Sequence, residues 1–178
     1  MIRLFAAVEV PPEIGRDLQH RQHGIPDARW RPLEALHITL RFFGETPENV
    51  ARDLDEELNG IGGGPLEIVL SGAGSFGEGD DVRAVWAGVE ENEALKLLAS
   101  RCEAAARRAG LKPETRRYKP HVTLAYLKRP DPAKVAAWIA DHNLLRSPPF
   151  RVTWFGLYSS RLSPEGSHYE LEREYPLN

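Results

Sequence analysis

The chain has 178 residues, of which 42% are hydrophobic and 28% are charged, and its formal net charge is −3. This length suits one domain, and the lack of a basic excess argues against a protein that coats long nucleic acid, since phosphate neutralisation supplies most of that affinity. No apolar run approaches the roughly 18 residues that cross a membrane, the N-terminus lacks a signal-peptide pattern, and the lone Cys102 has no intramolecular disulfide partner. We therefore expect a cytoplasmic protein, without excluding an enzyme that binds one phosphate in a small cleft.

The first half of the chain alternates between strand and helix patterns. In chain order, we predict a strand at residues 3–10, a helix opened by Pro11-Pro12, a strand at 36–43, a helix after Thr46-Pro47 and a strand at 66–70. Thr46 is expected to cap the second helix, with Pro47 at its first helical position.

The second half predicts the same order of elements. These are a strand at 82–89, a helix at 91–109, a strand at 119–127, a helix capped by Asp131 before Pro132, a strand at 150–158 and a last strand at 169–175. A run rich in glycine and acidic residues, 74–81, is the expected join between the halves.

An internal repeat becomes visible when the sequence is shifted by 84 positions. His37-Ile38-Thr39-Leu40 then falls on His121-Val122-Thr123-Leu124, and Phe42 falls on Tyr126. We infer an α+β fold in which residues 1–178 form a single bilobal domain, with one lobe at about 1–76 and the other at about 80–178. Each lobe is expected to have an antiparallel-rich sheet and helices, a pseudo-twofold axis relates the lobes, the site lies between them, and strand exchange is compatible with this division.

The doubled His-x-Thr pattern predicts paired acid–base chemistry. Alternate residues of a strand share a face, so His37 lies beside Thr39 and His121 beside Thr123. Because imidazole titrates near neutral pH, one ring can act as a base while the other acts as an acid. The threonine hydroxyls can donate hydrogen bonds to phosphate oxygens. This set favours displacement at a phosphodiester, although strand geometry alone does not decide which histidine has which role.

The two motifs resemble those of the two-histidine phosphoesterase superfamily, and within it the RNA 2′,3′-cyclic phosphodiesterases, once called 2′-5′ RNA ligases. The matching segments are 3–7, 36–44, 85–88, 119–124 and 157–160. The resemblance implies a bilobal fold, no metal and no other cofactor, His37 as proton donor, His121 as proton acceptor, and a product with a 2′-phosphate. It implies RNA ends or small nucleotides with a 2′,3′-cyclic phosphate as substrates, and we expect a monomer that binds neither long duplexes nor membranes.

Three further residues are candidates for substrate or phosphate binding. Arg41 shares strand parity with His37 and Thr39, and Phe42 matches a family position that can stack on a base. The family often has an arginine five residues after the second histidine, and this sequence has Tyr126 there. Tyr158 and Ser159 are also expected to line the site.

Other functions remain open from the sequence. The same two histidines could serve a 2′-5′ RNA ligase, in which a 5′-hydroxyl replaces water, or a phosphodiesterase for small cyclic nucleotides. From different classes, the chain could be a non-catalytic RNA-end binder, or a metallohydrolase with both histidines as ligands. No carboxylate accompanies either motif at ligand spacing, which disfavours the last interpretation.

Overall fold

The computed structural model describes residues 1–164 and 166–178. The strands are β1 (Ile2–Glu9), β2 (Arg29–Trp30), β3 (His37–Thr46), β4 (Leu66–Ile68), β5 (Leu70–Phe76), β6 (Ala84–Val89), β7 (His121–Tyr126), β8 (Phe150–Val152), β9 (Trp154–Ser163) and β10 (Gly166–Pro176). The helices are α1 (Pro12–Gln19), α2 (Glu48–Asn59), α3 (Glu93–Arg108) and α4 (Pro132–His142), with 3₁₀ turns η1 (Leu33–Ala35) and η2 (Gly79–Asp81).

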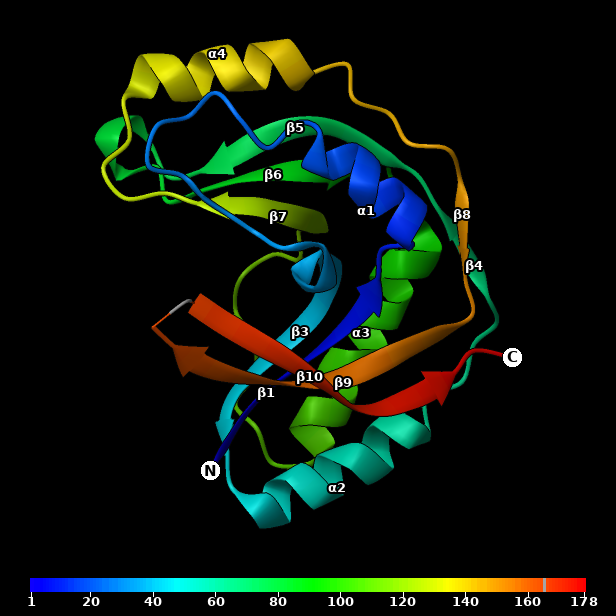
Figure 1. Ribbon diagram of the computed structural model, residues 1–178. Coiled ribbons are helices and arrows are strands. Elements are labelled where there is room, and N and C mark those ends of the chain that lie inside the picture. Colours follow the sequence, from blue (N-terminus) through cyan, green and yellow to red (C-terminus); the bar gives the residue numbers. More distant parts are fainter. Residues whose placement is uncertain (165) are drawn as a thin grey trace.

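In the described residues the strands form two larger antiparallel sheets and one short pair. The first sheet has the order β10-β9-β1-β3, the second has the order β2-β7-β6-β5, and β4 pairs with β8. Figure 1 shows α4 outside the second sheet and α2 outside the first, with α3 packed against α2 and β3. The α+β class expected from the alternating patterns is confirmed.

Each half of the sequence contributes strands to the sheet that carries the other half's motif. β5, from the first half, pairs with β6, and β9, from the second half, pairs with β1. Neither half therefore completes its sheet alone. We propose that the chain is one bilobal domain whose lobes are the two sheets, because the exchanged strands tie them together.

The strand β5 extends into the segment that was expected to be a join. The prediction gave a single strand at 66–70, but the structure has β4 there, and a separate strand β5 runs from Leu70 to Phe76 and pairs Gly74 with Trp86. A Cβ at Gly74 would lie only 2.4 Å from the Trp86 ring, so the absence of a side chain is what lets β5 cross that ring. Gly74, which resembled part of a linker, instead serves close packing.

Side-chain caps were predicted at the starts of α4 and α2, and only the cap of α4 is confirmed. Asp131 caps α4 by accepting a hydrogen bond from the Ala133 amide at 3.0 Å, as expected. The predicted cap at Thr46 is wrong, because Thr46 is the buried last residue of β3 and its hydroxyl donates to the Gly44 carbonyl at 2.9 Å. Pro47 instead precedes α2 without a side-chain cap.

The two motif strands carry matching β-bulges. In the β1–β3 pair, Ala6 faces Arg41 and Ala7 faces Thr39, so Leu40 has no partner. The β6–β7 pair likewise skips Leu124, since Val85 faces Ala125 and Trp86 faces Thr123. A bulge inserts one extra residue and reverses the alternation of the side chains that follow it. The bulges thus lie 84 positions apart, and each follows a His-x-Thr motif directly.

Candidate active site

We call the sheet face opposite the helices the inner face. Ile38 is buried on the helix side of β3, so the half-buried His37 and Thr39 lie on the inner face by alternation. On β7 the buried Val122 separates the half-buried His121 and Thr123 in the same way. The two strands contact each other across the molecule, which brings the two polar pairs together.

Aromatic rings surround His37. Its ring stacks on Phe5 at a centroid distance of 5.0 Å and on Tyr158 at 5.8 Å, while Tyr169 meets it edge-on at 5.1 Å. Burial, together with the charges of Arg31 and His121, lowers the pKa of His37 from 6.5 to about 4. His37 is therefore neutral at pH 7 when no anion is beside it.

His121 has a ring whose orientation is fixed by the backbone. Its Nδ1 lies 2.7 Å from the Lys119 carbonyl, an oxygen that can only accept, so Nδ1 carries the proton and Nε2 is left as a base. Phe76 contacts the ring edge-on at 4.7 Å, and Trp86 lies 6.1 Å away. Burial lowers the pKa of His121, and the Lys119 charge lowers it further, while the hydrogen bond to the Lys119 carbonyl opposes both.

The two threonine hydroxyls are available to a ligand. Among the described residues, neither Thr39 nor Thr123 forms a side-chain hydrogen bond. A residue just before the second motif holds the backbone at Thr39, because the Tyr118 hydroxyl donates to the Thr39 carbonyl at 2.9 Å. This bond links the segment before His121 to the strand that carries His37.

The prediction that Arg41 faces the site is contradicted by the structure. Its Nε donates to Glu103 on α3 at 2.7 Å, and its Nη2 donates to the Lys112 carbonyl at 2.6 Å. The bulge at Leu40 reverses the parity on which the prediction rested. Arg41 therefore stabilises the contact between β3 and α3.

The same bulge places Phe42 on the inner face. Phe42 pairs with Phe5, its ring lies 5.8 Å from the Phe5 ring, and it remains 56% exposed. An exposed ring beside the Phe5–His37 stack is suited to contact a base. Tyr158 is also near the site, through its stack on His37, whereas Ser159 donates to Glu172 at 2.7 Å.

Tyr126 reaches the inner face through the bulge at Leu124, and it meets an arginine that the sequence patterns did not single out. The Arg31 guanidinium carbon lies 5.4 Å from the centroid of the Tyr126 ring. Arg31 follows β2, a strand of two residues that was not predicted because it is too short to show a periodic pattern. Trp30 packs on Trp138 of α4, and the residues on either side of Trp30 point to the opposite face. This alternation around an apolar Trp30 is the sequence feature that could have indicated Arg31.

Two kinds of feature are absent from residues 1–164 and 166–178. No group of three or more His, Cys, Asp or Glu side chains is arranged to hold a metal ion. Within the same residues, every helix is too short or too polar to span a bilayer.

Comparison with known sequences defines the class of protein. The model of the 2′-5′ RNA ligase superfamily matches residues 10–163. The chain belongs to this superfamily, and the family expected from the two His-x-Thr motifs is therefore confirmed.

Curated relatives match over nearly the whole chain. A protein of Archaeoglobus fulgidus named RNA 2′,3′-cyclic phosphodiesterase is 30% identical over 95% of this chain and 97% of its own length. A protein of the same name from Escherichia coli K12 is 32% identical over 98% of this chain and 96% of its own. The activity given in these names is that of the two relatives.

Solved structures show the same fold. LigT of Escherichia coli, complexed with 3′-AMP, superposes with a TM-score of 0.82 at 26% identity, covering 99% of this chain and 98% of LigT. The protein TT0787 of Thermus thermophilus gives a TM-score of 0.81 at 27% identity over 99% of this chain and 98% of its own.

Proposed function

We propose that this protein is an RNA 2′,3′-cyclic phosphodiesterase that forms a 2′-phosphomonoester by acid–base catalysis with its two histidines. The observation that carries the proposal is the pairing of His37 with a His121 ring held with Nε2 unprotonated. Relatives of nearly the same length that are named for this activity support it.

In the proposed reaction, His121 is the base. Its Nε2 accepts a proton from water, and the water oxygen attacks phosphorus. The bond from phosphorus to the 3′ oxygen breaks, and that oxygen takes a proton from His37. The phosphate remains on the 2′ oxygen, and proton exchange with solvent restores both rings.

The low pKa of His37 in the free protein has a consequence for this mechanism. A general acid must hold a proton, yet His37 with a pKa of about 4 is mostly neutral near pH 7. The cyclic phosphate carries one negative charge, and an anion beside an imidazole favours its protonated form. Substrate binding is therefore expected to raise the pKa of His37 and to charge the acid only when it is needed.

The hydroxyls of Thr39 and Thr123 are proposed to donate to the non-bridging phosphate oxygens. Each lies two residues from a histidine on the same face of its strand, and neither is engaged by another described residue. Phe42 is proposed to stack on the terminal base.

Ligation is the second candidate, favoured by the superfamily match. A 5′-hydroxyl would replace water as the nucleophile, and the 3′ oxygen would leave in the same way. The product would be a 2′-5′ phosphodiester. The geometry of the two histidines serves both reactions.

The deciding experiment is incubation of the purified protein, in EDTA, with a short RNA that ends in a 2′,3′-cyclic phosphate. We expect a 2′-phosphate product, whose formation His121→Ala should slow by about 10²–10⁴-fold. A 3′-phosphate would contradict the assigned leaving group. No turnover by the wild type in EDTA would contradict the proposal, and recovery with added Zn²⁺ would favour a metallohydrolase. A parallel reaction with a 5′-hydroxyl RNA tests for ligation.

A further inference from the structure

Arg31 is a buried cation without a charged partner. Arg31 is 9% exposed, and among the described residues its side chain makes one hydrogen bond, from Nη2 to the Ser167 carbonyl at a long 3.4 Å. No carboxylate in residues 1–164 or 166–178 forms an ion pair with it. Buried charges in proteins are normally paired, because removing a charge from water is costly. The guanidinium therefore retains unused capacity to bind an anion.

Two tyrosines hold this guanidinium in place. Its carbon lies 5.4 Å from the Tyr126 ring of the second sheet and 5.3 Å from the Tyr169 ring of the first. Contacts of this kind stabilise a cation by less than burial of an unpaired ion costs. The rings orient Arg31 between the two sheets but do not replace a counter-ion.

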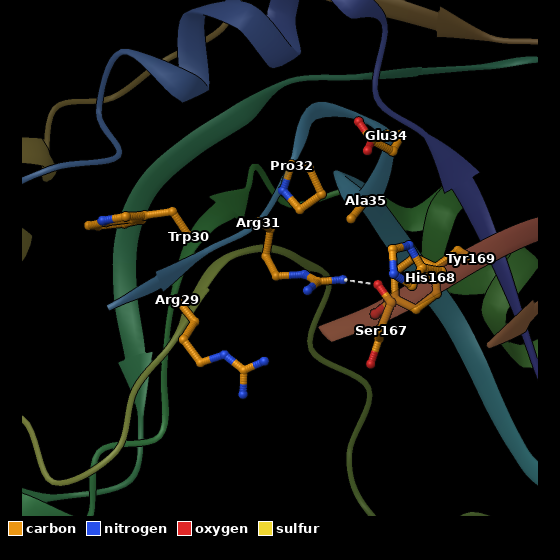
Figure 2. Close-up of a pocket in the computed structure, with 9 residues that line it drawn as sticks. All are labelled: Arg29, Trp30, Arg31, Pro32, Glu34, Ala35, Ser167, His168 and Tyr169. Atoms are coloured by element: carbon orange, nitrogen blue, oxygen red, sulfur yellow. Dashed lines mark hydrogen bonds between the residues drawn. The ribbon is translucent and has the colours of Figure 1, made fainter. Parts of the chain in front are cut away.

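The position of Arg31 places it beside the catalytic residues. Its amide donates to the Leu124 carbonyl at 2.8 Å, next to Thr123. Figure 2 shows Trp30 pointing away from Arg29 and Arg31, so the two arginines share the inner face. The charge of Arg31 is close enough to His37 to contribute to its lowered pKa.

A cavity of roughly 160 Å³ opens at this point between the two sheets. Arg29 and Arg31 line it on one side, and Ser167 and Tyr169 line it on the other. Tyr169 also meets the His37 ring, so the cavity adjoins the proton donor. Glu34 also lines the cavity, and in Figure 2 its carboxylate is well apart from the Arg31 guanidinium.

We propose that Arg31 binds the non-bridging oxygens of the cyclic phosphate, with Tyr126 acting as its platform and not as a ligand of the substrate. This inference rests on the proposed function. A planar guanidinium can donate two parallel hydrogen bonds to one phosphate, which fixes the orientation of phosphorus as well as its charge. Arg29 is exposed, is absent from the groups that shift the pKa of His37, and is not part of this contact.

The test compares Arg31→Met with Arg52→Met, at an exposed arginine of α2 outside the cavity, on two substrates, a short RNA with a terminal cyclic phosphate and 2′,3′-cyclic AMP. The mononucleotide has no phosphate other than the cyclic one. We expect Arg31→Met to lower kcat/KM about 10- to 100-fold on both substrates, as for loss of a hydrogen bond to a charged group. Arg52→Met should change kcat/KM on the mononucleotide less than about 3-fold, as for an exposed group. A loss confined to the RNA would overturn the assignment to the cyclic phosphate.

A binding measurement separates this inference from the proposed function. Inorganic phosphate is titrated into the ¹⁵N-labelled wild-type protein while the Arg31 Nε–H signal is followed, with Arg31→Lys used for assignment. We expect a saturable shift of that signal, and weaker phosphate binding by Arg31→Lys because lysine lacks the planar fork. A signal that does not move overturns the inference even if the enzyme is active. Wild-type inactivity on both substrates, with the shift present, would instead count against the proposed function alone.

Discussion

The strands β3 and β7 carry the same motif, the same bulge and the same alternation, yet they surround their histidines differently. His37 lies among Phe5, Tyr158 and Tyr169 without a hydrogen bond to fix its tautomer, in the described residues. His121 has its Nδ1 held by the Lys119 carbonyl.

The two rings are equivalent in the sequence repeat, and their neighbours in the structure make them unequal. A ring with a fixed Nδ1 proton is ready to accept at Nε2. A ring in an apolar stack beside a cation is kept neutral until an anion arrives. Pairs of titratable groups whose environments differ in this way are typical of an acid and a base with separate roles.

The largest expected effect is that of removing either ring. His37→Ala and His121→Ala should each lower kcat by about 10²–10⁴-fold, because each removes a positioned proton transfer.

The wild-type profile of kcat/KM against pH should be bell-shaped and centred below pH 6.5, since both histidine pKa values are lowered. His121→Ala should lose the limb at low pH, and His37→Ala the limb at high pH. The opposite pattern would exchange the two roles.

The next effect concerns stability. Because folding lowers the pKa of His37 from 6.5 to about 4, the unfolded chain binds the proton more tightly, and stability should fall as pH falls through this window. A shift of about 2.5 pK units corresponds to about 3 kcal/mol. Urea unfolding at pH 7 and pH 4 should therefore show a smaller loss for His37→Gln than for the wild type. His20→Gln, at an exposed position, is the control; equal losses in all three proteins would refute the expected shift.

Substitutions of Thr39 and Thr123 test whether β3 and β7 contribute equally to phosphate binding. Thr39→Val and Thr123→Val should each lower kcat/KM about 10- to 100-fold, since each removes a hydrogen bond to a charged group. Thr39→Ser and Thr123→Ser keep the hydroxyl and should retain most of the activity. If both valine variants turn over at the wild-type rate, the hydroxyls do not contact phosphate.

Phe42 and Tyr126 occupy equivalent positions, and only Phe42 is proposed to touch a base. Phe42→Ala should weaken RNA binding by about 1–3 kcal/mol, the usual contribution of one stacked base. Binding is measured with a non-hydrolysable RNA end. Leu144→Ala, at a residue that is 91% exposed, should leave affinity unchanged. An equal affinity for Phe42→Ala would argue against stacking there.

The smallest effect is expected from the direct link between the motifs. Tyr118→Phe removes the hydrogen bond to the Thr39 carbonyl and should cost about 1 kcal/mol of stability. Thermal unfolding at pH 7 measures this cost. A kcat within about 2-fold of wild type is expected, since the hydroxyl is not proposed to touch substrate. A larger fall in kcat would mean that this bond positions Thr39 for catalysis.

Much of the site could be predicted from local sequence. The pairs His37–Thr39 and His121–Thr123 followed from a strand period of two and from the 84-residue repeat. The roles of the pairs stay a proposal, but their placement on the inner faces agrees with the prediction. Most strand and helix positions were also predicted within a few residues, because their apolar periods are strong.

The sequence by itself determined the elements, the repeat and the two motifs, since these depend on local spacing. Only the tertiary structure decided the faces of Arg41 and Tyr126, because a bulge arises from the register between two strands and leaves no period in either one. It also decided that Arg31 lies between Tyr126 and Tyr169, since these contacts join residues 95 and 138 positions apart in the chain. Contacts of that kind depend on how the sheets exchange strands, which no single segment encodes.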